Sequence, residues 1–151
     1  MPPPETGPYL KAALLCENVI EDKQGVLSFI RVIDRFMQMA VGPAAPSDMP
    51  PLEVGIYAVI MLVAGQAQGS QEVKLVLRKP SGLAQELGVT TVLLEGEDRG
   101  ANIIARLQLV LESQGLYWIE VTTEGQLLTK MPLRVVYGRM TTGTPSTGFP
   151  S

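Results

Sequence analysis

Acidic side chains are the first candidates for chemistry in this sequence. Glu95, Glu97 and Asp98 stand together around a glycine, and carboxylate oxygens are the ligands that Ca²⁺ prefers. The three residues lack the regular ligand spacing and the terminal Glu of a calcium-binding loop. We therefore interpret them as a solvated turn and predict no metal site.

General acid–base catalysis would need two carboxyl groups that converge from different elements, one of them with a raised pKa. Glu17, Glu53, Glu95 and Glu120 all lie in or beside expected strands. The sequence leaves open whether any two of them meet. Without a pocket, a chance meeting would carry no chemistry, so these residues do not predict an active site.

Histidine is absent from the 151 residues. The chain therefore lacks the usual general base near neutral pH, the commonest zinc ligand and the central member of a Ser-His-Asp triad. The glycines form neither a GxGxxG nor a GxxxxGK[ST] phosphate-binding loop. We predict that the protein is not an enzyme, with no catalytic, cofactor-binding or metal-binding residues.

Trp118 is the residue that most suggests binding. It is the only Trp, and strict alternation places it on the face of its strand opposite Tyr117, beside Glu120. Exposed aromatic residues are enriched at binding hot spots, although a neighbouring loop or tail could cover this one. The expected interaction surface consists of Trp118, Glu120, Tyr57, Met61 and Pro132.

The elements that would position Trp118 form a closing β-hairpin from Gly115 to Tyr137. Two alternating runs flank a Glu124-Gly125 turn, which is typical of a hairpin. Pro132 has no N–H to donate, so the last strand should lie at a sheet edge or carry a bulge there. The side chains expected to face the core are Tyr117, Ile119, Val121, Met131, Leu133 and Val135.

Similar alternation predicts strands through most of the chain. The run Leu52–Ala64 is apolar on both faces, so a loop or another subunit should cover its outer side. Ala101–Glu112 fits a helix or a strand, and its position between two β runs favours a strand. The eight expected strands are Leu10–Val19, Val26–Phe36, Leu52–Ala64, Glu72–Lys79, Val89–Glu95, Ala101–Glu112 and the two strands of the closing hairpin.

Turn residues separate these runs. Glycine-containing stretches at Gly65–Ser70 and Gly96–Gly100 predict turns. Four prolines in Val41–Pro51 exclude a central strand and predict an exposed crossover. We expect flexible tails at residues 1–8 and 138–151, which leave one domain at residues 9–137.

Composition limits the classes of partner and the cellular compartment that we expect. A net charge of −3 favours binding to neither nucleic acid nor an anionic membrane. The single Cys16 lies in an apolar run and is expected to be a buried free thiol. The N-terminus has no basic, apolar signal pattern, and the apolar run Val54–Ala64 is about half of the roughly 20 residues that a membrane helix needs. These features predict a cytoplasmic protein.

Both ends of the chain resemble a family of uncharacterised bacterial all-β proteins of unknown function. The matching segments are Leu14 to Val19, Gly25 to Asp34, Gly115 to Val121 and Pro132 to Val135. The sequence departs from the family pattern at Arg31, where members often have Gly, and at Ile119, where Phe is common. The resemblance implies an all-β sandwich and supports the strand interpretation of Ala101–Glu112. It implies no activity and no functional residues.

We therefore predict an antiparallel β-sandwich of about eight strands, with an Ig-like or related topology. The expected function is a non-catalytic protein-interaction or scaffold module that associates with itself or with a protein partner. The alternative is a sandwich that binds a small ligand or a carbohydrate in a groove near Tyr57, Trp118 and Tyr137.

Overall fold

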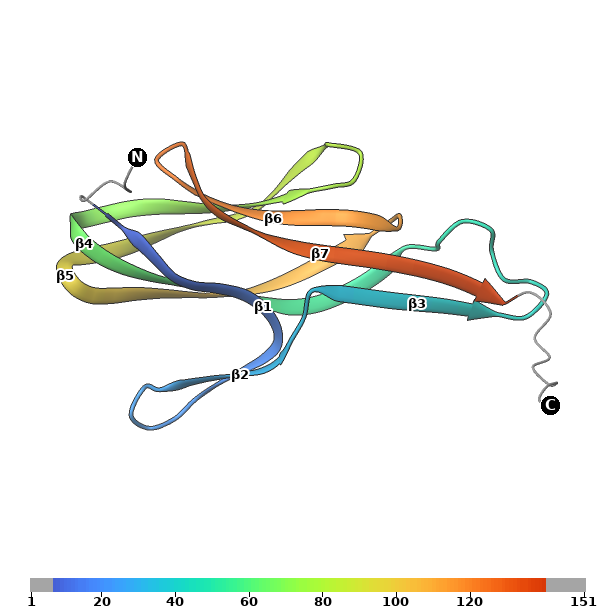
Figure 1. Cartoon of the computed structure of the whole chain (residues 1–151), viewed down its shortest axis with the longest axis horizontal. Helices are drawn as coiled ribbons and strands as arrows, with labels where there is room; N and C mark the ends of the chain where they lie inside the picture. The colour runs from blue at the N-terminus through green and yellow to red at the C-terminus, as the bar shows by residue number, and fades with distance from the viewer. Residues whose placement is uncertain (1–6, 141–151) are drawn as a thin grey trace.

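The computed structural model describes residues 7–140, and every regular element in that range is a β-strand. The prediction of an all-β fold is therefore confirmed. The described residues form seven strands rather than about eight. Two pairs of expected strands are each joined into one long strand, and one expected strand is divided in two. The strands in Figure 1 are β1 (Tyr9–Glu21), β2 (Leu27–Val32), β3 (Arg35–Val41), β4 (Leu52–Arg78), β5 (Ala84–Leu111), β6 (Gly115–Thr123) and β7 (Gln126–Met140).

The seven strands join one mixed sheet that does not close on itself. Six follow the order β2-β1-β4-β6-β7-β3, and β5 pairs with β4 outside this path. All pairs are antiparallel except β3 and β7, which run parallel from Arg35–Arg134 to Val41–Met140. The expectation of a purely antiparallel sheet is wrong at this pair. Turn signals report only strands that follow each other in sequence, whereas β3 pairs with the last strand of the chain.

The expected turns at Gly65–Ser70 and Gly96–Gly100 do not reverse the chain. β4 runs through the first and β5 through the second, so each strand joins two expected strands into one. The pairing register between β4 and β5 shifts between Val63 and Gln68, and Gly65 and Gly96 have positive φ values of 63° and 90°. These are features of β-bulges, which bend a strand without ending it. The strand interpretation of Ala101–Glu112 is confirmed up to Leu111.

The bend gives the two halves of β4 different neighbours. Residues 57–63 lie between β1 and the second half of β5, whereas residues 73–78 lie between β6 and the first half of β5. Ile60 from the first half and Leu75 from the second belong to one buried hydrophobic cluster. The residues of the closing hairpin that were expected to face the core are confirmed, and they belong to the same cluster: Tyr117, Ile119, Val121, Met131, Leu133 and Val135.

The expected strand Val26–Phe36 is divided in two. β2 pairs with β1, and the chain then leaves that edge to pair with β7 as β3. The division falls at residues 33–34, just after Val32, which is still paired with Cys16. Arg31, within β2, has a left-handed φ of 55° and no paired residue in the β1–β2 register, and this conformation is costly for a residue with a Cβ. The β1–β2 ladder is therefore irregular at Arg31.

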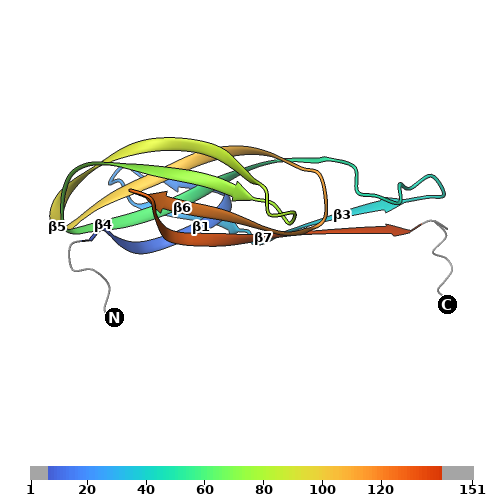
Figure 2. The same cartoon turned by 90° about the horizontal axis from the view of Figure 1, so that it is seen from above.

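Two ribbons project from the body of the sheet. The β1–β2 arm consists of residues 17–32, and the β3–β7 arm consists of residues 35–41 and 134–140. Figure 1 shows the first arm below the body, and Figures 1 and 2 both show the second extending away from it. Each arm is two strands wide beyond its base, because residues 17–21 pair only with β2 and residues 136–140 pair only with β3. At the base of the second arm, Arg134 and Val135 also pair with β6.

The first and last strands reach almost to the ends of the described residues. β1 begins at Tyr9, and β7 continues to Met140, beyond the expected last strand residue Tyr137. Most of the two expected tails, residues 1–6 and 141–151, lies outside the described residues. Within residues 7–140, no helix is long and apolar enough to cross a membrane.

Candidate functional site

Three of the five residues expected to form an interaction surface lie together on β6 and β7. Trp118 stands between Arg78 of β4 and Pro132 of β7, and Glu120 is paired with Lys130. The Lys130 ammonium lies 4.4 Å from the centroid of the Trp118 ring, which is within the range of a cation–π contact. Trp118 is half-buried rather than fully exposed, because neighbouring side chains cover part of its ring.

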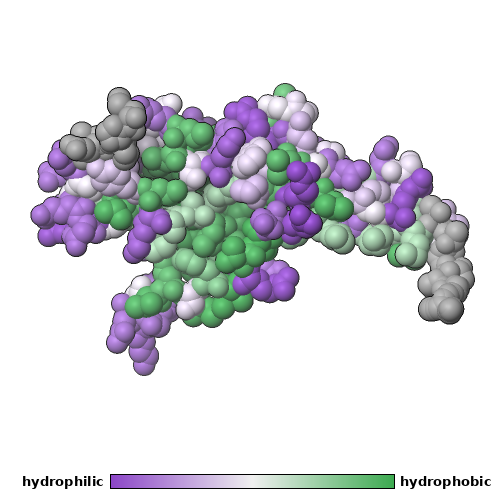
Figure 3. Space-filling view, viewed as in Figure 1, coloured by the Kyte–Doolittle hydropathy of each residue, from purple (hydrophilic) through white to green (hydrophobic). Residues whose placement is uncertain are grey.

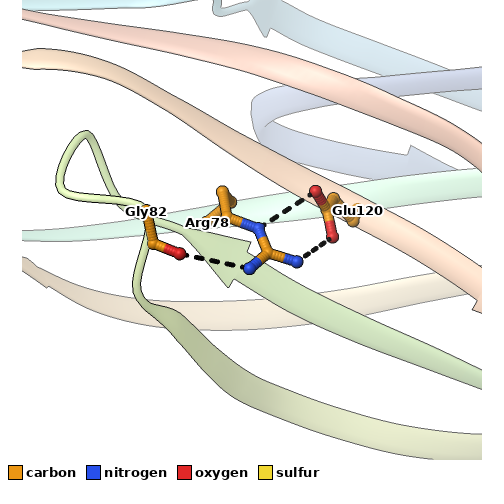
Figure 4. A network of polar contacts seen from close by, with 3 residues as sticks. All are labelled: Arg78, Gly82 and Glu120. Carbon is orange, nitrogen blue, oxygen red and sulfur yellow. Dashed lines mark hydrogen bonds and ion pairs between the residues drawn. The ribbon is translucent and has the colours of Figure 1, made fainter.

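The charged neighbours of Trp118 are held by a short polar network. Arg78 donates from Nε and Nη2 to the two carboxylate oxygens of Glu120 at 3.3 and 3.0 Å, and from Nη1 to the carbonyl oxygen of Gly82 at 3.2 Å. Figure 4 shows the guanidinium between these two partners. The hydrogen bond to Glu120 and the charge of that carboxylate raise the pKa of Arg78 above its usual value. The site is therefore a fixed ion pair beside an aromatic ring.

The other two expected residues lie on a different part of the sheet. Tyr57 and Met61 are in the first half of β4, where Tyr57 is paired with Cys16 and Arg106. The Arg106 guanidinium lies 5.2 Å from the Tyr57 ring centroid. Tyr57 and Met61 are half-buried, and Val59 between them is fully buried. The expected surface of five residues is therefore two separate surfaces.

The aromatic residues of the alternative hypothesis also lie apart. Tyr137 is paired with Gln38 in the β3–β7 arm, and its hydroxyl donates to the carbonyl oxygen of Pro46 at 2.6 Å. It has no paired residue in common with Tyr57 or Trp118. None of the three lines any of the five best-formed grooves in the described part of the chain.

One strongly exposed apolar surface is absent from the sequence interpretation. On one face of the β3–β7 arm, Met37, Met39 and Val41 are 65%, 54% and 64% exposed, and Met140 stands beside Val41. We call these four residues the arm stripe. Figure 3 shows apolar side chains along the β3 side of this arm. The alternation of Arg35, Met37, Met39 and Val41 was a usable signal, but the expected strand ended at Phe36.

Two arginines stand at the body end of the arm stripe. Arg35 and Arg134 are neighbours in the parallel register of β3 and β7. Both side chains are exposed, and neither guanidinium forms an ion pair with another residue in 7–140. Like charges in adjacent strands destabilise the pairing slightly. The face therefore combines an apolar stripe with an uncompensated positive charge at one end.

The opposite face of the β3–β7 arm is covered by the loop 42–51. This loop accepts hydrogen bonds from Tyr137 at Pro46 and from Arg139 at Ala45, the latter at 3.4 Å. Met49 of the loop is buried in the hydrophobic core. Only the face with the arm stripe is left exposed, and the expected exposed crossover at Val41–Pro51 is in part a structural cover.

A groove lies between the free edges of β1 and β7, where neither strand pairs with the other. It encloses about 240 Å³ and is lined by residues that include Leu10, Leu14, Val32, Met131 and Pro132. Figure 3 shows apolar side chains gathered over β1 and toward β7. The groove is therefore a second apolar surface, on the body of the sheet.

Pro132 lies at a free edge of β7, as predicted. The pairing of β3 with β7 begins only at Arg35 and Arg134. Just before it, the carbonyl oxygen of Asp34 accepts a hydrogen bond from the Arg134 N–H at 2.9 Å. Pro132 precedes these contacts and is paired only with Trp118 of β6, so its missing N–H interrupts no ladder.

The acidic side chains do not form a metal-binding cluster in the described part of the chain. A carboxylate oxygen of Glu17 lies 2.8 Å from Nε of Arg31, and one of Glu95 lies 4.0 Å from Nη1 of Arg99. Glu120 binds Arg78. Within residues 7–140, no group of three or more Cys, Asp or Glu side chains could hold a metal ion. These three carboxylates therefore face arginines rather than one another.

Cys16 is a free, fully buried thiol, as predicted. Burial raises its pKa above the ordinary value, and a hydrogen bond from the backbone of Asn18 opposes this shift. A buried thiol with a raised pKa is mostly protonated, and the thiolate is the nucleophilic form. Cys16 is therefore a packing residue.

Comparison with known proteins places the chain among uncharacterised relatives. A family model described as "Family of unknown function (DUF6941)" matches residues 11–136. A search of the curated proteins finds no match. The matched segment contains all of β2 to β6 and most of β1 and β7.

Solved structures show only weak likenesses. β-Glucosidase 3B from Thermotoga neapolitana, in complex with glucose, aligns at 10% identity and a TM-score of 0.46, over 54% of this chain and 14% of that chain. The DNA glycosylase AlkC of Pseudomonas fluorescens, bound to DNA containing an abasic site analog, aligns at 8% identity and a TM-score of 0.40, over 82% of this chain and 30% of that chain. At such low TM-scores these likenesses carry no argument about function.

Proposed function

The chain belongs to the DUF6941 family, whose function is unknown, and we propose that it is a non-catalytic protein-interaction or scaffold module. The observation that carries this proposal is the pair of projecting arms with exposed apolar side chains. Soluble proteins seldom leave large apolar residues together at the surface unless another molecule covers them.

Both arms have this character. Met37, Met39 and Val41 are exposed on the β3–β7 arm, and Ile30 and Val32 are exposed on the β1–β2 arm. A two-stranded ribbon is marginally stable in water, and a parallel pair is usually covered on both faces. A protein that docks on the arms would cover these side chains and add strands or contacts to each ribbon.

The contacts of the charged residues support a role in binding rather than in catalysis. Glu17, Glu95 and Glu120 face arginines, so these carboxylates form ion pairs with cations of the same chain and do not converge on one another. Trp118, flanked by Arg78 and Lys130, has the composition of a binding hot spot. It forms a second candidate contact on the body.

The architecture that we propose for this module is an open β-sandwich with an immunoglobulin-like or related topology. The support is the shared core, to which both halves of the bent β4–β5 hairpin contribute side chains. Two sheet halves that share one core must face each other. The arms then extend from a rigid body, as an interaction module requires.

Affinity capture followed by light scattering tests the proposed function. The probe is the wild-type protein, compared with a variant that carries Met39→Glu and Val32→Glu, one charge on each arm. The matched control is Leu93→Glu, because Leu93 is 63% exposed but lies on β5 in the body. We expect a stoichiometric partner, either another protein or a second copy, that the arm variant loses and the control keeps.

The opposite result is equally clear. A wild-type protein that stays monomeric at all concentrations, with no partner that distinguishes the arm variant from the control, would overturn the proposal. Both variants change exposed side chains, so their unfolding temperatures should remain close to that of the wild type.

A further inference from the structure

We propose that the β3–β7 arm binds an extended segment of a different protein, which pairs with the free edge of β3 and carries alternating apolar residues with a carboxylate at one end. This inference rests on the proposed function and assigns a partner chemistry to one arm. The mode is β-strand addition, in which backbone hydrogen bonds supply affinity and alternate side chains supply specificity.

The edge of β3 lacks the features that protect other edges of the sheet. Among the described strands β3 pairs only with β7, so its other edge has unpaired N–H and C=O groups. Its sequence, RFMQMAV, has one charged residue and no proline. Edge strands are usually blunted by charges, prolines or bulges. β5, which also has a free edge, contains Glu86, Glu95 and Arg106, and β2 contains the charged, left-handed and unpaired Arg31.

The arm stripe defines the side-chain pattern of the segment. Met37, Met39 and Val41 point to one face of the arm, two residues apart, and all are more than half exposed. A strand added beside β3 would place every second side chain next to them. Methionine side chains adapt their shape to different apolar partners. The added strand should therefore have apolar residues at alternate positions on this face.

The two arginines define the charge of the segment. Arg35 and Arg134 lie next to each other at the body end of the arm stripe, without an ion-pair partner among residues 7–140. A carboxylate placed at this end would accept charge-assisted hydrogen bonds from the guanidinium groups. It would also relieve the repulsion between two like charges. The partner should therefore have Asp or Glu at the end nearest Arg35.

A second copy of this chain does not supply that charge. If two β3 strands paired antiparallel over their full length, Val41 of the second copy would lie opposite Arg35, and β3 contains no acidic residue. If they paired parallel and in register, a further arginine would lie beside Arg35. Charge complementarity therefore favours a different protein over self-association at this edge.

The experiment selects displayed random peptides against the immobilised full chain. We expect the enriched peptides to combine alternating apolar residues with Asp or Glu at one end. Met37→Ser/Met39→Ser should weaken their binding by at least about tenfold, as loss of a hot spot does. The matched control Leu93→Ser/Val110→Ser, at two exposed apolar residues of β5 in the body, should leave binding unchanged. When the immobilised target is the variant Arg35→Glu/Arg134→Glu, the enriched peptides should carry Lys or Arg in place of Asp or Glu.

Three results would overturn this inference, and each is distinct from failure of the proposed function. Enriched peptides that bind Met37→Ser/Met39→Ser as well as the wild type would show a site elsewhere. A wild-type dimer, detected by light scattering and lost in that variant, would show that a second copy occupies the edge. Both results leave an interaction module in place. If the wild type is monomeric and no peptide is enriched, the β3 site is rejected. The proposed function is then tested separately by the capture experiment.

Discussion

Arg78 and Glu120 connect β4 to β6 through two hydrogen bonds between one guanidinium and both oxygens of one carboxylate. The same guanidinium also binds the carbonyl oxygen of Gly82, in the turn that leads from β4 to β5. One side chain thus links three segments around Trp118. This geometry needs the planar arginine fork, which lysine does not provide.

Reversal of the charge at position 78 should therefore destabilise the fold, and reversal of both charges should restore it. We expect Arg78→Glu to lower the unfolding temperature, because two carboxylates then face each other. Arg78→Glu/Glu120→Arg should recover most of the loss. An arginine guanidinium stays charged throughout the mildly alkaline range, so the effect should persist there. Thermal unfolding of the wild type, the two single variants and the double variant gives the comparison, and additive effects would argue against the pair.

We expect the fold to be more stable with glycine than with arginine at position 31. Its φ of 55° is left-handed, which costs a residue with a Cβ roughly 1–2 kcal/mol. Its ion pair with Glu17 is exposed and is worth at most about 1 kcal/mol. We expect Arg31→Gly to raise the free energy of unfolding by roughly 0.5–1 kcal/mol. Urea denaturation measures this change, and Glu17→Gln controls for loss of the ion pair alone.

Two glycines of the β4 bend provide a matched pair. Gly65 and Gly69 both have positive φ values, but a Cβ at Gly65 would lie 2.5 Å from Cε2 of Tyr9, whereas a Cβ at Gly69 would meet nothing within 4 Å. Gly65→Ala should cost roughly 2–4 kcal/mol, from backbone strain and overpacking together. Gly69→Ala should cost only the strain, about 1–2 kcal/mol. Equal losses in chemical denaturation would contradict the close approach to Tyr9.

Cys16 should make stability fall at alkaline pH. Burial raises its pKa above the ordinary value, so the folded state holds the thiol proton more tightly than the unfolded state does. The stabilising effect is complete below the unfolded pKa and is lost as pH rises through the folded pKa, with a slope of at most about 1.4 kcal/mol per pH unit. Urea denaturation midpoints of the wild type, measured at increasing alkaline pH, should show this loss of stability. In Cys16→Ala, the part of the loss that is due to the thiol should be absent.

Gln38 in the β3–β7 arm carries a buried polar atom without a partner. Its side-chain oxygen Oε1 is buried and forms no hydrogen bond within the described residues. Burial of an unpaired acceptor costs about 1–3 kcal/mol. Gln38→Met has a similar shape and removes this acceptor, so it should raise the free energy of unfolding by about 1 kcal/mol. A lower stability, measured by urea denaturation, would show that the amide group makes a contact of its own.

The sequence predicted the parts of the fold that depend on neighbouring residues. Alternation in Gly115–Tyr137 identified the closing hairpin, its turn and all six inward side chains. Pro132 correctly indicated a free edge, because a missing N–H is a property of the residue itself. Cys16 was recognised as buried from the apolar run around it.

Long-range relationships were decided only by the tertiary structure. The glycine-containing segments near positions 65 and 96 have a composition that fits both a chain reversal and a bend within a strand. The pairing of β4 with β5 determines which of the two occurs. The same limit applies to the candidate site. Met37, Met39 and Arg35 become one surface with Arg134 and Met140 only because β3 pairs in parallel with the last strand. Local patterns encode the face on which a side chain lies, but the partner of a strand depends on the packing of the whole chain.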